Sequence, residues 1–468
     1  MDSFSKSVNP NKHLKEQFVS NLTGSSMLEI FSLSVIIPAV ILLRRAIGFN
    51  FVNGCDVTQS SLKKHDNAVI PRNRMAYTAT MIVDFLVVIL PVLLFLTVLA
   101  EWTYAGATVL TLLLLACIVI KRCGSSSTKS LQSYHSLRTS ISSYRVAMMI
   151  VTCLCILAVD FQIFPRRYAK TETYGTSWMD LGVGSFVLAN ALVSRQARNV
   201  SSRKWTSTLQ STFPLILLGL VRLILTAGVD YQVHVGEYGV HWNFFFTLAA
   251  VSLLTSTINV SPEYCGILGL LILTGYQICL MQGLNVYLVS NKRETDIISL
   301  NKEGIFSIFG YWGIYLVGVQ LAYHLFYQNN PTAASKDDQW ARTRVWVLSF
   351  LFWLVTMILD WHVERVSRRM CNLAYVTLVL AVNLQVLAIL MLSEYLPGSK
   401  FTAVEEAFNL NLLGSFLLAN VLTGVVNLSV DTISASSIEA LVILITYAFV
   451  LCFVTGVLGF CGFRCKFW

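Results

Sequence analysis

Long apolar segments separated by short polar loops dominate the chain between residues 26 and 460. A helix of about 20 apolar residues crosses the hydrocarbon layer of a bilayer, and about 17 residues is the lower limit. By this criterion the pattern predicts thirteen membrane-spanning helices. They cover residues 26–43, 78–99, 104–120, 146–164, 176–194, 212–229, 242–258, 264–282, 305–326, 344–360, 370–392, 406–426 and 438–460.

The predicted fold class is an all-α, polytopic membrane protein, because backbone groups in lipid need hydrogen-bond partners within their own segment. The polar first 25 residues have no cleavable signal pattern, so we expect residues 26–43 to remain as an anchor. The loops are too short for a soluble domain. We therefore expect residues 1–468 to form a single multi-pass domain.

Composition and charge narrow the function. Of the 468 residues, 55% are hydrophobic and 13% are charged, whereas soluble proteins carry about 25% charge. This excludes a soluble enzyme and a nucleic-acid binder, although the formal net charge is +9. Lys and Arg number 21 on one side of the predicted topology and 12 on the other. The richer side is expected in the cytosol, which predicts a lumenal N-terminus and a cytosolic C-terminus.

A nine-residue sequence recurs in the fifth and twelfth predicted spans. Residues 184–192 (GSFVLANAL) match residues 414–422 (GSFLLANVL) at seven positions. The two spans would cross the membrane in opposite directions, as inverted repeats do, and a pseudo-two-fold axis in the membrane plane is expected. Chance is the alternative, because Gly and Ser also permit close packing of unrelated helices.

Ionisable groups at a membrane face are the candidates for chemistry, since charge in lipid is costly. Asp160 is predicted at the lumenal end of the fourth span, and Pro165 ends that helix. The basic loop that follows contains Lys170, which is close enough in sequence to fold back onto Asp160. Such a carboxylate can act as a general base. An ion pair with a purely structural role is the alternative.

Further polar clusters are predicted at the same face, within residues 237–243, 285–304 and 420–431, and we expect a shared site. Basic residues in lumenal loops oppose the positive-inside trend, and guanidinium groups suit phosphate oxygens. The substrate-binding candidates are Arg166, Arg167, Glu172, His241, Asn243, Lys292, Asn420 and Asn427. The eleven cysteines show no zinc-ligand spacing, so no metal site is expected. Nucleophile-elbow and phosphate-loop motifs are also absent from the sequence.

Longer motifs resemble the PIG-W family of inositol acyltransferases in GPI-anchor biosynthesis. They are residues 15–24 (KEQFVSNLTG), 164–194 (FPRRYAKTETYGTSWMDLGVGSFVLANALVS), 237–246 (EYGVHWNFFF), 301–311 (NKEGIFSIFGY) and 417–428 (LLANVLTGVVNL). The family's thirteen or so helices and lumenal N-terminus agree with the charge count.

The resemblance implies transfer of a fatty acyl group, typically palmitoyl, to the inositol 2-hydroxyl of glucosaminyl-phosphatidylinositol in the endoplasmic reticulum membrane. It places catalytic roles on Asp160 and Lys170. Acyl-CoA is the implied co-substrate, and no other cofactor is expected. From the residues alone, a secondary transporter with inverted repeats remains the competing interpretation, and a non-catalytic scaffold is a third.

Overall fold

The structure is a computed structural model, and it describes residues 18, 20, 22–48, 74–124, 133–200, 205–227, 235–327, 334–396 and 401–464. These residues form a helical bundle, with two isolated bridges of Gly24 and Ser25 to Thr176. Eleven of its helical segments are long and apolar enough to cross a membrane. The prediction of an all-α, polytopic membrane protein is therefore confirmed for the described residues.

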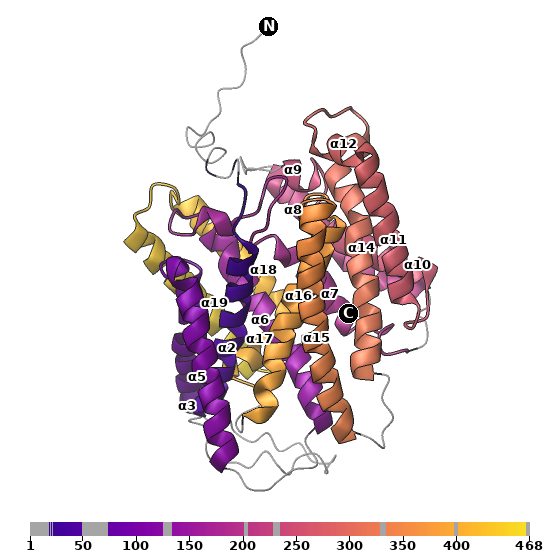
Figure 1. Cartoon of the computed structure of the whole chain (residues 1–468). Coiled ribbons are helices and arrows are strands. Elements are labelled where there is room, and N and C mark those ends of the chain that lie inside the picture. Colours follow the sequence, from indigo (N-terminus) through magenta and orange to yellow (C-terminus); the bar gives the residue numbers. More distant parts are fainter. Residues whose placement is uncertain are drawn as a thin grey trace.

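Eleven long segments make up most of the bundle (Figure 1). They are α2 (Met27–Ile47), α3 with η1 and α4 (Arg74–Asp84, Phe85–Ile89, Leu90–Phe95), α5 (Thr103–Gly124), α6 (Ser133–Ala158), α8 (Trp205–Ala227), α11 with η4 and α12 (Cys265–Cys279, Leu280–Leu284, Asn285–Val289), α14 with η5 (Lys302–Ala322, Tyr323–Tyr327), α15 (Ala334–His362), α16 (Leu373–Leu390) with η6 (Met391–Tyr395), α18 (Leu412–Ser429) and α19 (Ser437–Phe460). The 3-10 turn η2 (Ala100–Trp102) precedes α5.

Shorter helices connect or fill this frame. They are η3 (Arg166–Tyr168), α7 (Leu181–Leu192), α9 (Val235–Tyr238), α10 (Phe244–Ile258), α13 (Ile297–Leu300) and α17 (Ala403–Leu410). Helix α16 lies at the centre of the bundle, where it packs against α15, α2, α6, α7 and α14, and nearly all of its side chains are buried.

Two of the thirteen predicted spans are short helices, so the predicted count is not confirmed. Helix α7 has 12 residues and α10 has 15, which gives them lengths of about 18 and 22 Å at 1.5 Å per residue. The predicted span 176–194 begins with a turn because Asp180 is buried and bonded to Thr171, which holds the chain out of the helix. The orientation in the membrane remains a prediction.

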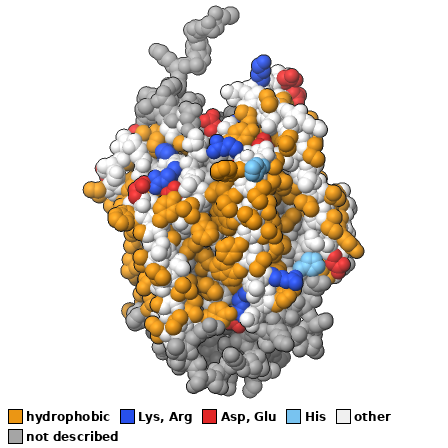
Figure 2. Space-filling view, viewed as in Figure 1, with side chains coloured by type: hydrophobic (Ala, Val, Ile, Leu, Met, Phe, Trp, Pro, Cys, Tyr) orange, Lys and Arg blue, Asp and Glu red, His pale blue; other side chains and the backbone are white. Residues whose placement is uncertain are grey.

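The surface and the ion pairs distinguish the two ends of the bundle. Apolar side chains cover the broad middle of the visible face, and charged side chains gather mainly toward its upper edge (Figure 2). Helices α9 and α12 lie at this upper end (Figure 1), which we call the α9 end. At the opposite end of α2, the buried Arg44 pairs with Asp84 at 2.8 Å and the buried Arg45 pairs with Glu405. These pairs tie α2 to α3 and α17.

Candidate functional site

The four polar clusters predicted to share a site are linked to one another at the α9 end. The Asn427 side-chain amide donates to Asp160 at 2.8 Å, and the Lys170 ammonium pairs with Glu237 at the same distance. The backbone N–H of His241 then donates to the Asn301 side chain at 2.7 Å. These contacts bring together groups from four segments: α18, the loop after α6, α9 with the residues that follow it, and the start of α14. Asp160 and Asn427, which are in contact, are 267 residues apart in the sequence.

Asp160 lies in the turn that ends α6, not inside the helix as predicted. Helix α6 ends at Ala158, and the Asp160 N–H donates to the Leu157 carbonyl at 3.1 Å. The side chain is half-buried, and Asn427 fixes one of its two carboxylate oxygens. A carboxylate held in this way can accept a proton from a substrate hydroxyl within hydrogen-bond reach.

Arg166 closes the carboxyl end of α6. Its Nη2 group donates to the carbonyls of Val159, Phe161 and Phe164 at 2.7, 3.2 and 3.1 Å. These carbonyls belong to the turn that follows α6, and the Phe161 carbonyl also accepts from the Phe164 N–H. Burial lowers the pKa of Arg166 to about 10, while the nearby Asp160 raises it. Most of the donors expected to contact phosphate are therefore engaged with backbone, and Arg166 supports the turn that holds Asp160.

Arg167, the next residue, joins the same loop to the start of α2. Its guanidinium pairs with Glu29 at 2.9 Å and with the exposed Glu101 at 2.7 Å. Burial favours the neutral form of Arg167, but the bonds to Glu101 and Glu29 outweigh it and raise the pKa. The Tyr168 hydroxyl donates to the same Glu29 carboxylate at 2.8 Å. Arg167 thus has protein carboxylates as its partners in this structure.

Lys170 belongs to a network of four charged side chains, the Lys170 network, formed by Lys170, Glu237, Arg368 and Asp180. Glu237 accepts from Lys170 at 2.8 Å and from Arg368 at 3.1 Å, and Arg368 also pairs with Asp180 at 3.0 Å. Burial would raise the pKa of the Glu237 carboxyl, but Lys170 and Arg368 outweigh it and hold the pKa well below its usual range. Within the described residues, Lys170 forms no ion pair with Asp160.

A second group of buried charges lies beside this network and fixes the segment between α12 and α14. Glu303 is fully buried and pairs with Arg369 at 2.9 Å and Arg293 at 2.6 Å. The buried Lys302 ammonium donates to the carbonyls of Tyr287 and Ser290, each at 2.7 Å. These contacts join α12, the start of α14 and the loop before α16.

The sequence prediction placed Glu237 in a polar cluster of the shared site without giving it a role, counted Arg368 only among the basic residues of lumenal loops, and did not assign Asp180. Arg368 lies in a short basic loop on the predicted lumenal side, where its charge opposes the positive-inside trend. Such an arginine needs an anionic partner, and this signal pointed to it. The identity of the partners depends on tertiary contacts across 131 residues and more, which spacing in the sequence cannot supply.

The remaining predicted binding residues differ in how exposed their side chains are. Asn243 is buried and caps α10, accepting from the N–H groups of Phe245 and Phe246 and donating to the Gly219 carbonyl. Asn420 is exposed and donates to the carbonyl of Phe416 in its own helix at 2.7 Å. The side chains of Glu172, His241 and Lys292 are exposed at the α9 end.

A cluster of four phenylalanines lies between α7, α10 and α18. The rings of Phe186 and Phe416 are 6.1 Å apart, and Phe244 lies 5.6 Å from Phe186 and 6.2 Å from Phe416. Phe245 lies 6.2 Å from Phe416 and completes the cluster. Phe186 and Phe416 occupy the same position in the repeated nine-residue sequence. The two repeats therefore touch through this pair of rings, and the predicted pseudo-two-fold axis remains a prediction.

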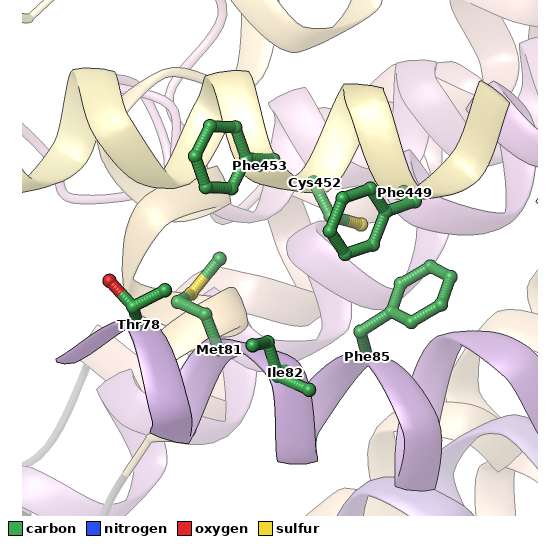
Figure 3. A pocket seen from close by; sticks show the side chains of 7 residues that line it. All are labelled: Thr78, Met81, Ile82, Phe85, Phe449, Cys452 and Phe453. Carbon is green, nitrogen blue, oxygen red and sulfur yellow. The ribbon is translucent and has the colours of Figure 1, made fainter. Parts of the chain in front are cut away.

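An apolar cleft occurs elsewhere on the bundle, between α3 and α19. Figure 3 shows its lining side chains, with Met81 and Phe85 facing Cys452 and Phe449 across the gap. The lining residues are Thr78, Met81, Ile82, Phe85, Phe449, Cys452 and Phe453. The cleft therefore offers neither a carboxylate nor an imidazole, in contrast to the α9 end. No metal-binding group of three or more His, Cys, Asp or Glu occurs among the described residues.

Comparison with known proteins gives matches along nearly the whole chain. A family model described as GWT1 matches residues 11–458. An uncharacterized protein of Arabidopsis thaliana is 56% identical over 92% of this chain and 98% of its own length. The GPI-anchored wall transfer protein 1 of Aspergillus oryzae is 36% identical, with 95% and 96% covered. The glucosaminyl-phosphatidylinositol-acyltransferase PIGW of Bos taurus is 33% identical, with 98% and 99% covered.

Proposed function

The chain belongs to the GWT1 family, which confirms the resemblance found in the sequence, and we propose that it is a membrane-bound acyltransferase of GPI-anchor biosynthesis. In the proposed reaction it transfers a fatty acyl group, typically palmitoyl, from acyl-CoA to the inositol 2-hydroxyl of glucosaminyl-phosphatidylinositol. The near-full-length similarity to the Bos taurus acyltransferase supports this activity. The proposed location is the endoplasmic reticulum membrane, with the α9 end in the lumen.

The observation that carries the proposal is the location of Asp160 and Lys170 in one loop at the α9 end, where Asn427 holds the first and Glu237 the second. Asp160 takes the proton from the inositol 2-hydroxyl, and the oxygen attacks the thioester carbonyl of acyl-CoA. The ammonium of Lys170 stabilises the oxyanion that forms on the carbonyl. Collapse of this tetrahedral intermediate breaks the carbon–sulfur bond, and the leaving thiolate of CoA receives the proton from Asp160.

The apolar and exposed groups around this pair suggest where the substrates bind. The phenylalanine cluster, which lies between the repeats, suits the acyl chain, because apolar surface is favourably removed from water. The exposed Lys292 and His241 are available to the phosphate and sugar of the acceptor lipid. Acyl-CoA is cytosolic, so its thioester must reach the α9 end through the bundle.

The activity is tested by acyl-CoA-dependent labelling of glucosaminyl-phosphatidylinositol with the purified protein. Asp160→Asn and Lys170→Ala should each lower turnover at least ~100-fold, within the range of acid–base catalysis. Asp296→Asn is the matched control, because Asp296 caps α13 and Asn caps a helix equally well. Near-normal turnover of either site variant would leave its residue with a structural role. Absence of labelling by the unaltered protein would favour a transporter or scaffold.

A further inference from the structure

We infer that Arg368 is a positioning residue that fixes Lys170 through two carboxylates, Glu237 and Asp180. The inference rests on the proposed function, in which Lys170 stabilises the oxyanion. Arg368 lies in the loop between α15 and α16, far in sequence from Lys170, and it does not contact Lys170 directly. Its role is to hold the two groups that determine where the Lys170 ammonium lies.

The first of these contacts acts on the side chain of Lys170. A single oxygen of Glu237, Oε1, accepts from Lys170 Nζ at 2.8 Å and from Arg368 Nη1 at 3.1 Å. The Lys170 side chain is 42% exposed, so it has no tight packing to restrict it. Glu237 on α9 therefore provides the restraint, and Arg368 in turn restrains Glu237.

The second contact acts on the backbone beside Lys170. Arg368 Nε pairs with Asp180 Oδ1 at 3.0 Å. Asp180 accepts from the N–H of Thr171 at 3.1 Å and from its hydroxyl at 2.7 Å. Thr171 follows Lys170 directly in the chain. One guanidinium group thus fixes both the peptide next to Lys170 and the carboxylate that binds its ammonium.

Arginine suits this role because its rigid fork can bind two carboxylates at once, which the single ammonium of lysine does less well. Only 5% of the Arg368 side chain is exposed, and its own loop is bonded to the loop after Lys170. The Gly175 N–H donates to the Val366 carbonyl at 2.8 Å, and the Ser367 hydroxyl donates to the Thr173 carbonyl. These bonds between the two loops therefore fix the position of the guanidinium relative to Lys170.

The test compares Arg368→Lys and Glu237→Gln with Arg45→Lys, in the full-length purified protein. Arg45 is the matched control, because it is similarly buried and also pairs with a carboxylate. Its partner is Glu405, and the pair lies at the end of α2 that is far from the α9 end. The two network variants should lower kcat roughly 10- to 100-fold per folded molecule, since small displacements of a catalytic group have effects of this size. KM for both substrates should change little. Arg45→Lys should lower the thermal midpoint and leave kcat unchanged.

A double variant shows whether Glu237 acts through Lys170. If it does, Glu237→Gln added to Lys170→Ala should lower kcat by no more than about twofold beyond Lys170→Ala alone, because contacting groups that act together are not additive. If the two substitutions lowered kcat independently, so that their effects multiplied, the positioning role would be overturned. It would also be overturned if Arg368→Lys and Glu237→Gln had the same kcat as Arg45→Lys while Lys170→Ala had a lower one. Near-normal turnover of Lys170→Ala would instead overturn the proposed function of Lys170. If Arg368→Lys fails to fold, Glu237→Gln and the double variant decide.

Discussion

Replacing Asn243 by alanine should destabilise the protein, because the structure uses the whole side-chain amide to hold α10. The Oδ1 atom accepts from the Phe245 and Phe246 N–H groups at 3.0 and 3.3 Å, which caps the first turn of α10. The Nδ2 group donates to the Gly219 carbonyl of α8 at 3.0 Å, and the side chain is almost fully buried. One residue therefore caps one helix and joins it to another.

The size of the effect follows from these contacts. Loss of an N-cap side chain costs about 0.5–2 kcal/mol, and loss of a buried hydrogen bond costs a further ~1 kcal/mol. Asn243→Ala should therefore lower the free energy of unfolding by about 1.5–3 kcal/mol. Asn420→Ala is the control, because Asn420 is exposed and its side chain donates to a carbonyl of its own helix. Surface changes of this kind stay within about 0.5 kcal/mol.

The assay is thermal and denaturant unfolding of both variants in the same detergent, followed by steady-state kinetics on the folded fraction. A large loss of stability for Asn243→Ala alone supports the capping role. If both variants unfolded like the unaltered protein and Asn243→Ala raised KM for the lipid acceptor, the reasoning would be refuted. Asn243 would then be a substrate contact, as its place in a polar cluster predicted.

Three further predictions concern packing, the end of α6 and pH. Gly310→Ala should cost at least ~2 kcal/mol of stability, because the added Cβ would lie 2.1 Å from the Cys371 carbonyl oxygen. A Cβ at Gly275 would meet open space, so Gly275→Ala should be neutral or slightly stabilising, and melting curves of both variants check this. Arg166→Gln should lower the free energy of unfolding by about 1–3 kcal/mol, because it removes the guanidinium donor of the Val159 carbonyl in the turn after α6. An unchanged melting curve would contradict this. Burial would raise the pKa of Glu237, but Lys170, Arg368 and Arg222 outweigh it and hold the pKa below its ordinary value of 4.5. The stability that this carboxylate contributes is therefore fully present above pH 4.5 and is lost as the pH falls further. Glu237→Gln should show a smaller loss of stability on acidification than the unaltered protein.

The sequence predicted the helices well where apolar runs were long and less well where tertiary contacts end a helix. The run at 176–194 is apolar enough to suggest a span, but the buried Asp180 bonds to Thr171 and Arg368 and delays the helix to Leu181. The start of α10 is similarly set by the Asn243 cap. Hydropathy alone does not detect such contacts, because they depend on partners from other segments.

The same distinction applies to the candidate site. The convergence of four polar clusters was predictable, since charged and amide groups in membrane proteins tend to face the interior of the bundle and pair with one another. The pairing inside the site was not. Lys170 was expected on Asp160, ten residues away, but it binds Glu237, 67 residues away, because the loop between them is fixed by Arg166 and Asp180. Nearness along the chain is a poor guide wherever a loop is held by buried charges.

The place of the Lys170 network at the outer end of the bundle has a consequence for the lipid acceptor. Arg369 binds Glu303 in the first turn of α14, and the neighbouring Arg368 binds Glu237 on α9. The network therefore lies level with the outermost turn of α14, and the Lys170 side chain is partly exposed there. Under the proposed function, the acceptor reaches Lys170 with its inositol ring at the surface of the bundle, where the ring keeps most of its water. The longer path then belongs to the acyl donor, whose thioester must come from the cytosolic side.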